Sequence, residues 1–507
     1  MTKNKQLAIN MSASFIAYIV SFGISFFLSP YIVKNVGVDA YGFVGLANNF
    51  VSYASLITIA LNALAGRFVT IKIYEKDMHG ANIYFSSVFI ANLLISVVMG
   101  IIGLGVVIFL EKLINLPSNL YWDVKLLFAC LFLNCLIGTV GSVFAISTFA
   151  TNKLYINSIR QIESNILRVF ILVPAFILLK PRVAYLGISA LVMGVYVFAF
   201  NIYYTKKLLP EIHIRRKYFD IKAIIKLISS GVWNLIVRVG QILSDGLDII
   251  ICNIFINPTS MGIMSLSKTV PGIITGIVGS IVGVFSPNMT ILYAEKKYNE
   301  LYDIIKQSMK IMGIITNIPV IVLIVCGKLF FELWQPTQDA KMLQILSVLT
   351  IGCVIFSGGI NVLYDLFTVV NKLKMNAVIV LISGAIQIII TFILLKTTSL
   401  GIYAVAGVST IVSIVRNLVF TVPYGAICLN KKWYTFYPDV VRPVTLVGVS
   451  SLLGILVNRM FEFSGWIGLI LFVIIIVSIT CTIGAFVILN HNDRVYIINT
   501  LIDRRKK

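Results

Sequence analysis

The chain has 507 residues, of which 59% are hydrophobic and only 12% are charged. Soluble globular proteins carry roughly twice that share of charged residues, so the composition excludes an ordinary soluble protein. The formal net charge of +21 raises nucleic acid as a partner, but the positions of the cations along the chain argue against it.

Apolar runs long enough to cross a bilayer recur from one end of the sequence to the other. About 20 residues in a helix span roughly 30 Å of hydrocarbon, and about fourteen such runs leave no room for a soluble domain. The sequence therefore predicts an all-α polytopic membrane protein with about fourteen transmembrane helices. The expected helices lie near residues 10–33, 43–66, 83–110, 121–149, 156–179, 183–204, 228–256, 260–285, 308–331, 342–370, 375–396, 399–424, 440–460 and 464–489.

Lys and Arg residues are unevenly shared between alternate loops. With the amino terminus taken as cytoplasmic, loops on that side hold about 28 of the 41 cations, the opposite loops about 9, and the helix interiors about 4. This positive-inside distribution predicts that both termini are cytoplasmic, and it explains the net charge without nucleic acid. The seven Cys and three His residues show no metal-ligand spacing, so no cofactor is expected.

Two halves of the sequence resemble each other at an offset of about 215–220 residues. "DAYGFVGL" at 39–46 matches "TSMGIMSL" at 259–266, and "TNKLYIN" at 151–157 matches "VNKLKMN" at 370–376. Six helices in each copy, an even number, predict two lobes in a parallel pseudo-two-fold repeat, an arrangement that usually encloses a central site.

The repeat gives a predicted domain organisation. We expect an N-lobe of helices one to six at 1–204, a basic cytoplasmic linker at 205–227, a C-lobe of helices seven to twelve at 228–430, and two C-terminal helices with a basic cytoplasmic tail at 431–507. The sequence leaves open whether the linker is an amphipathic surface helix or an extended segment.

The expected seventh helix carries a polar face that lipid cannot contact. Its polar residues are spaced 4, 3, 4 and 3 apart, which places all five on one side of a helix. They are Asn234, Arg238, Gln241, Asp245 and Asp248.

The repeat assigns matching polar faces to the helices of the first half. Ser21 and Ser25 of the first helix align with the polar face of the seventh helix, and Asn48 of the second helix aligns with Lys268 of the eighth. Both pairs of faces are expected to meet across one cavity.

Four cations lie inside expected helices: Arg168, Arg238, Lys268 and Arg416. A cation that faces lipid at the centre of a helix costs about 2.5–3.5 kcal/mol on insertion scales. Either these cations pair with intramembrane acids and hold helices together, or they line an aqueous cavity that acids only partly neutralise. We favour the cavity, because Arg238 has no acid three or four residues further along its helix. Its natural guest is a multiply charged anion such as a phosphate, which Arg binds through two parallel hydrogen bonds.

Three intramembrane acids, Asp245, Asp248 and Asp365, have two interpretations. They can balance cavity cations such as Arg238 or Arg416, or they can bind a proton or sodium ion that drives transport. Gly246 permits a local distortion of the helix between the first two. The predicted substrate-binding residues are Arg238, Lys268, Arg168, Arg416, Asn48, Ser21, Ser25, Asn234 and Gln241.

The opening sequence carries a resemblance to a known family. "NMSASFIAYIVSFGISFFLSPYIVKNVGVDAYGFVGLANNF" at 10–50, with Pro30, Gly37, Tyr41 and Gly42, resembles the polysaccharide flippases that handle O-antigen and capsule repeat units. This family belongs to the multidrug, oligosaccharidyl-lipid and polysaccharide exporter superfamily. The resemblance covers nearly the whole chain and implies a V-shaped fold of two lobes.

The resemblance implies a transporter of the bacterial plasma membrane and not an enzyme. Its cargo would be an undecaprenyl-pyrophosphate-linked oligosaccharide, carried from the cytoplasmic to the outer face by alternating access while the polyprenyl tail stays among membrane lipids. A proton or Na⁺ is the candidate coupling ion, and a polysaccharide polymerase with its chain-length machinery is a candidate partner. Related lipid II flippases place cavity cations on the first, second and eighth helices. Only Lys268 matches that set, so a capsule or O-antigen type of repeat unit is expected.

Two alternatives remain open. A multidrug exporter of the same superfamily usually has twelve helices and a cavity for cationic drugs, which the extra helices and the cationic surplus disfavour. A membrane polysaccharide polymerase or glycosyltransferase generally needs a large outer loop or an outer acidic motif. The expected outer loops here are short, as in "NPTS" at 257–260.

Overall fold

The computed structural model describes residues 3–62, 64–282 and 285–488, and it consists of helices joined by short connections. Within these residues, thirteen helical stretches are long and apolar enough to cross a membrane. A further candidate is the bent pair Ile221–Ser229 and Gly231–Gly246, whose two parts differ in direction by 52°. The prediction of an all-α protein with about fourteen membrane spans is therefore confirmed.

The chain forms two compact units. The first unit comprises Met1–Ile242 and Ile249–Ser265, and the second comprises Leu243–Asp248 and Leu266–Lys507. The expected lobes divide the chain at 228, whereas in the structure the helix that begins at Ile221 packs with the first unit as far as Ile242. The predicted boundaries of lobes, linker and C-terminal pair remain a prediction.

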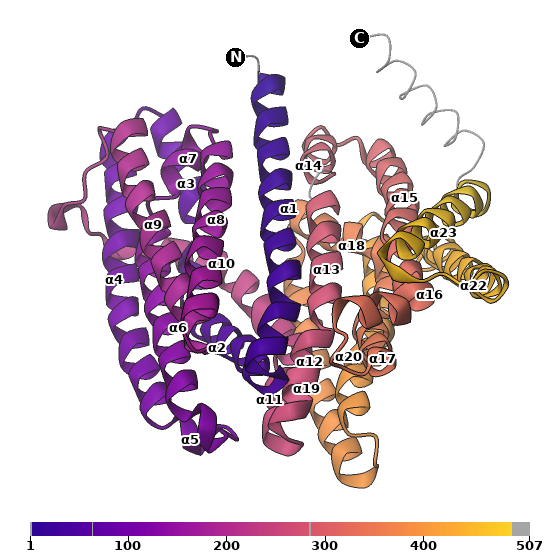
Figure 1. The fold of residues 1–507 in the computed structure, drawn as a ribbon. Helices are drawn as coiled ribbons and strands as arrows, with labels where there is room; N and C mark the ends of the chain where they lie inside the picture. Colours follow the sequence, from indigo (N-terminus) through magenta and orange to yellow (C-terminus); the bar gives the residue numbers. More distant parts are fainter. Residues whose placement is uncertain (1–2, 63, 283–284, 489–507) are drawn as a thin grey trace. The chain divides into compact units, whose positions relative to one another are not determined.

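In the first unit, long apolar helices pack side by side. The helices α4, α6 and α9 form its centre, α1 runs along α8, and α2 packs against both α6 and α10 (Figure 1). The close approach of α10 to α2 depends on Gly231, where a Cβ atom would lie 2.1 Å from the Ala60 carbonyl oxygen. The helices are α1 (Lys3–Val36), α2 (Val38–Asn62), α3 (Ala65–Tyr74), α4 (Met78–Ile108), α5 (Leu110–Leu113), η1 (Ser118–Leu120), α6 (Tyr121–Gly141), α7 (Ile146–Ala150), α8 (Tyr155–Leu178), α9 (Ala184–Leu208), η2 (Arg216–Tyr218), α10 (Ile221–Gln241), and most of α11 (Asp248–Phe255) and α12 (Pro258–Ser267).

The second unit packs around α16 and α18. The last two helices, α22 and α23, close one apolar core with α16, in which Ile321, Phe472 and Ile476 are fully or almost fully buried. The elements are η3 (Ile242–Gly246), α13 (Thr269–Val282), α14 (Ser286–Ala294), α15 (Tyr298–Ile315), α16 (Asn317–Trp334), α17 (Ala340–Ile351), α18 (Val354–Val369), α19 (Leu373–Thr397), α20 (Ile402–Arg416), η4 (Asn417–Thr421), α21 (Val422–Cys428), α22 (Tyr437–Met460) and α23 (Gly465–Val487).

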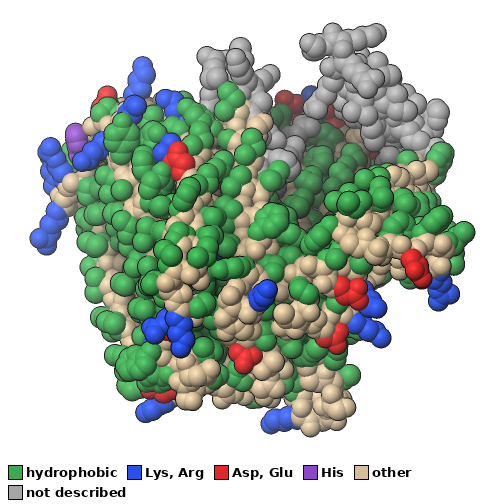
Figure 2. All heavy atoms as spheres, viewed as in Figure 1, with side chains coloured by type: hydrophobic (Ala, Val, Ile, Leu, Met, Phe, Trp, Pro, Cys, Tyr) green, Lys and Arg blue, Asp and Glu red, His purple; other side chains and the backbone are tan. Residues whose placement is uncertain are grey.

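The surface of the first unit suits a lipid environment. Large apolar side chains on its helices are exposed, among them Ile101, Leu104, Phe170 and Ile177. On the face seen in Figure 2, these helices present a broad apolar band, and most of the Lys and Arg side chains gather toward the helix ends. Hydrocarbon is the solvent that such a band matches.

The internal repeat is visible in the backbone. Lys76 and Lys296 follow helices α3 and α14, lie 220 residues apart, and both adopt a left-handed conformation with φ of 59°. Asn152 and Asn371, 219 residues apart, do the same with φ of 54° and 55°. A left-handed non-glycine residue is uncommon, so two such pairs at the repeat offset are strong support for the predicted repeat.

The segment after α9 is extended rather than helical. No helix lies between Leu209 and Arg215, and a single 3₁₀ turn, η2, follows before α10 begins. The part of the predicted linker between Leu209 and Arg215 is therefore not helical, whereas its first and last residues belong to α9 and α10.

Candidate functional site

Lys268 forms a buried ion pair in the second unit. Its Nζ lies 2.5 Å from Oδ2 of Asp248 and donates a hydrogen bond of 2.7 Å to the backbone oxygen of Asp245. The side chain of Asp248 is only 5% exposed and that of Lys268 is 17% exposed. Lys268 is about 15 Å from either end of the span Pro258–Gly279, deep in the expected membrane region.

A proline explains why the helix is interrupted at Lys268. The residue lies at the break between α12 and α13, and Pro271 has no N–H to donate to the carbonyl of Ser267 four residues earlier. That carbonyl instead accepts a 2.8 Å hydrogen bond from Oγ of Ser347 on α17. The break therefore positions the ammonium group without leaving this backbone oxygen unpaired.

A π-helical turn lies in the middle of the seventh predicted helix, where its two acidic residues are. Residues Ile242–Gly246 form η3, and the backbone oxygen of Ser244 accepts a hydrogen bond from the side-chain amide of Gln387 on α19. Asp245 is exposed, whereas Asp248 after the turn is buried. The distortion occurs where Gly246 was expected to permit one, and π turns are frequent at functional sites.

Arg416 lies at a second π-helical turn of the same unit. It ends α20 directly before η4, and its guanidinium donates hydrogen bonds to Tyr364 Oη at 3.3 Å and to Ser383 Oγ at 3.5 Å. The Tyr364 hydroxyl in turn bonds to Oδ1 of Asn417.

Four predicted residues therefore share the second unit: Lys268, Asp248, Asp245 and Arg416. Asp365 is half-buried in the same unit on α18, next to Tyr364. Sequence reasoning missed the neutral partners in this region. Gln387 and Ser383 are four residues apart on α19, a polar spacing that was present in the sequence.

In the first unit, polar residues line the contact between α1 and α8. Asn165 donates a 2.6 Å hydrogen bond to Oγ of the predicted residue Ser21, and the hydroxyls of Ser14 and Ser158 lie 3.1 Å apart. A groove of about 400 Å³ lies along this contact and includes Gln161. Its lining residues are Ser14, Ala17, Tyr18, Ser21, Asn157, Ser158 and Gln161.

Arg168 extends the polar face of α8. Gln161, Asn165 and Arg168 are spaced four and three residues apart and so share one side of that helix. The first two were missed in the sequence, although this spacing marks them. Arg168 is half-buried, about 15 Å from the nearer end of α8, and its Nε has no hydrogen-bond partner in the described structure.

The other predicted residues of the first unit are exposed. Arg238 donates a 3.2 Å hydrogen bond to Oε1 of Gln241, one turn away on α10. Asn48 donates to the backbone oxygen of Val44 at 2.9 Å. The exposed set is Asn234, Arg238, Gln241, Asn48 and Ser25.

The predicted cations inside helices are not all paired with an acid. Of the four predicted cations, Arg168, Arg238 and Arg416 form no ion pair with an acid among the described residues, whereas Lys268 does. Asp248 thus balances Lys268, not Arg238 or Arg416 as the sequence suggested. Nor do the described His, Cys, Asp and Glu side chains form a group of three that could hold a metal ion.

Solved structures share this fold. "Lipid II flippase MurJ, inward closed conformation" superposes with a TM-score of 0.67 at 14% identity and covers 94% of this chain and 99% of that one. The inward-facing conformation of a multidrug resistance MATE family transporter of the MOP superfamily gives 0.66 at 13% identity, covering 83% and 98%. The chain therefore has the same fold as these all-helical membrane proteins.

Sequence comparisons define the family. Residues 7–293, more than half of the chain, match the family model described as "Polysaccharide biosynthesis protein", and the chain belongs to this family. It is also 26% identical over 447 residues to "Uncharacterized membrane protein EpsK" of Bacillus subtilis (strain 168), a match that covers 87% of each chain. The family resemblance predicted from the opening residues is confirmed. The protein is a multi-pass membrane protein of the polysaccharide biosynthesis family, and it has the fold of the MurJ and MATE structures.

Proposed function

We propose that this protein is a flippase that moves undecaprenyl-pyrophosphate-linked oligosaccharide repeat units from the cytoplasmic to the outer face of a bacterial plasma membrane. The observation that carries the proposal is the set of intramembrane arginines without an acidic partner among the described residues, Arg168, Arg238 and Arg416. Family membership places the chain in polysaccharide biosynthesis, and the cations favour an anionic cargo over a neutral or cationic one.

The chemistry of the cargo matches these arginines. A pyrophosphate offers several anionic oxygens that guanidinium groups bind bidentately. A cation left without counter-ion or water at membrane depth is costly, so a hydrated path that accepts phosphate explains why such residues are tolerated. The neutral polar residues Ser21, Ser25, Asn48, Asn234 and Gln241 would hydrogen-bond the sugar hydroxyls.

The proposal also assigns roles to the acids inside the membrane, which are ion coupling and charge balance. Asp245 is exposed within the π turn, and Asp365 lies in the same unit. Either residue is suited to take up the proton or Na⁺ that couples transport, whereas Asp248 serves as the counter-charge of Lys268. In this scheme both termini lie in the cytoplasm, in keeping with the positive-inside distribution of Lys and Arg.

The test is export in cells that lack the chromosomal gene. Arg168→Ala and Arg238→Ala are each expected to lower surface polysaccharide by about tenfold or more, because one charge-assisted hydrogen bond contributes about 1.5–3 kcal/mol. Lipid-linked oligosaccharide should accumulate on the inner membrane face, measured by its accessibility in inside-out vesicles. The amount of each variant in the membrane is measured in parallel.

Arg182→Ala is the matched control. Arg182 is 57% exposed in the loop before α9 and makes only a 3.9 Å contact with Asp123, so its loss should leave export unchanged. Full export by both Arg168→Ala and Arg238→Ala would contradict a cationic cargo path. Purified protein that covalently alters the lipid-linked oligosaccharide would point to an enzyme instead.

A further inference from the structure

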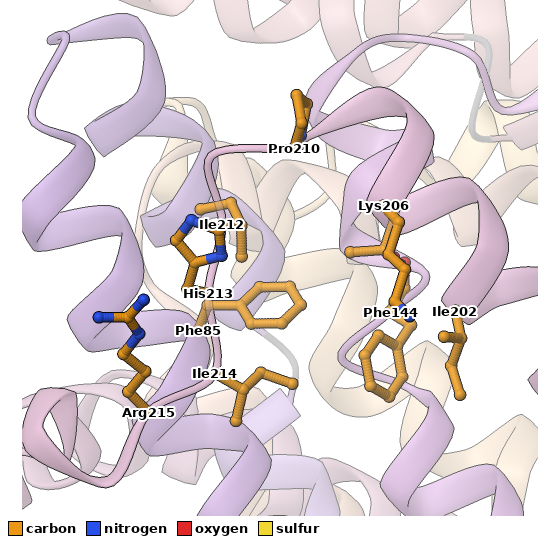
Figure 3. Close-up of a pocket in the computed structure, with 10 residues that line it drawn as sticks. Phe85, Phe144, Ile202, Lys206, Pro210, Ile212, His213, Ile214 and Arg215 are labelled. Atoms are coloured by element: carbon orange, nitrogen blue, oxygen red, sulfur yellow. The ribbon is translucent and has the colours of Figure 1, made fainter.

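A pocket of about 500 Å³ lies in the first unit, away from every residue assigned above to the cargo. It is formed by α4, the turn before α7, the end of α9, and the extended segment 209–215, which we call the strap. Figure 3 shows the strap residues 212–215 on one side and Ile202 and Lys206 of α9 on the other, with the Phe144 ring beside α9 and the Phe85 ring next to the strap.

The strap is held in place by buried polar side chains of α4. Asn82 donates to the backbone oxygen of Glu211 at 3.3 Å, and its Oδ1 accepts from the N–H of His213 at 2.6 Å. Ser86 donates to the backbone oxygen of His213 at 3.2 Å. Because these α4 side chains are 5% and 0% exposed, the strap is a fixed wall of the pocket.

The opposite wall is fixed as well. The Thr205 hydroxyl on α9 bonds at 2.8 Å to the backbone oxygen of Phe144, in the turn that precedes α7. Phe85 and Phe144 pack edge to face with ring centroids 6.1 Å apart. The pocket therefore has ordered apolar walls rather than being a gap between mobile side chains.

The rim of the pocket is cationic. Residues 205–218 contain five Lys or Arg residues and one acid, Glu211. Lys206 and Arg215 line the pocket, are exposed, and take part in no ion pair within the described residues. Phe85 lies about 10 Å into α4 from its first residue, so the apolar wall reaches toward the membrane while the cations stay at the helix ends.

We propose that this pocket binds one anionic phospholipid of the surrounding leaflet, with the anionic head group at the rim that carries Lys206 and Arg215 and the start of an acyl chain against Phe144 and Ile202. Basic pockets at the cytoplasmic ends of membrane helices recognise anionic head groups. A soluble anion would use the cations and leave the apolar walls unoccupied. A lipid satisfies both, and it would tie the strap that leads into α10 to the bilayer.

Lipid binding to the purified full-length protein tests this proposal, with phosphatidylglycerol compared with phosphatidylcholine of identical acyl chains by native mass spectrometry. Wild type should retain phosphatidylglycerol preferentially. The double variant Lys206→Gln/Arg215→Gln should bind it roughly 30-fold more weakly, because each cation near an anionic lipid contributes roughly fivefold.

Lys207→Gln/Lys217→Gln is the matched control. It removes the same charge from the same segment, but its two side chains lie over the rings of Tyr203 and Tyr218 and do not line the pocket. The control should bind phosphatidylglycerol like the wild type. If both double variants lose phosphatidylglycerol binding equally, the lipid is attracted by the general positive charge of the segment. If the wild type retains phosphatidylglycerol and phosphatidylcholine equally, the pocket has no anionic specificity. If millimolar inorganic phosphate displaces the lipid, the ligand is a soluble anion. Each of these results overturns the proposal.

Discussion

Replacing Lys268 with Met is expected to destabilise the second unit by about 3–5 kcal/mol, because it leaves the buried carboxylate of Asp248 without its counter-charge. Asp248→Asn should cost less, since Lys268 is the more exposed partner and keeps its hydrogen bond to the backbone of Asp245. The free energy of unfolding in mixed micelles measures both. The double variant Lys268→Met/Asp248→Asn should recover most of the loss, which gives the coupling between the two residues.

Lys328→Met provides the comparison for an exposed pair in the same unit. Lys328 and Glu332 are 3.5 Å apart with side chains 64% and 48% exposed, so removing the lysine should change stability by about 0.5 kcal/mol or less. If Lys268→Met and Lys328→Met have equal small effects, the ion pair is not a stabilising element. Export by the double variant separates two roles. A folded protein that no longer exports polysaccharide would mean that Lys268 also contacts cargo.

The fold could be predicted from the sequence because the length of the apolar runs and the distribution of Lys and Arg between the loops are properties of whole segments. Neither depends on which residues contact each other in the folded protein. The repeat was also readable, since its matching segments include the residues that end helices in both halves. Asn152 and Asn371 are left-handed at equivalent positions, and asparagine tolerates that conformation. These signals are local, so they survive without any knowledge of tertiary contacts.

The partners of the polar residues could not be predicted in the same way. Spacing placed Asp248 on a face with Arg238, but the π turn at Ile242–Gly246 rotates the chain between them. Asp248 therefore meets Lys268 within the second unit, whereas Arg238 belongs to the first unit. Likewise, the sequence of the strap does not specify that Asn82 and Ser86 will bind its backbone, because those contacts join segments more than 120 residues apart.

The structure explains why two positions of the opening motif are occupied by glycine. Gly37 has φ of 98° between α1 and α2, a conformation that favours glycine. Gly42 is needed for another reason. A Cβ atom at this position would lie 2.7 Å from the Cα of Gly262, its equivalent in the second copy of the repeat. Two repeat-related segments, α2 and α12, thus pack against each other through equivalent positions.

Gly42→Val is accordingly expected to destabilise the first unit by about 3 kcal/mol, the upper end of the usual cost of overpacking. The added side chain would meet backbone atoms of α12, which cannot move aside as a flexible side chain can. Gly262→Val should be at least as damaging, since its Cβ would lie 2.3 Å from the carbonyl oxygen of Val38. Because both changes force apart the same two helices, the double variant should cost less than the sum of the single variants.

Gly105→Val is the control for this pair. Gly105 lies in α4, and a Cβ atom added there would meet no neighbouring side chain or helix within 4 Å, so valine should alter stability by about 0.5 kcal/mol or less. Thermal unfolding of the detergent-solubilised protein, followed by size-exclusion chromatography after heating, ranks the variants. A Gly42→Val protein as stable as Gly105→Val would show that α2 and α12 do not approach closely, and with that the packing of the two repeat copies through Gly42 and Gly262 would have to be abandoned.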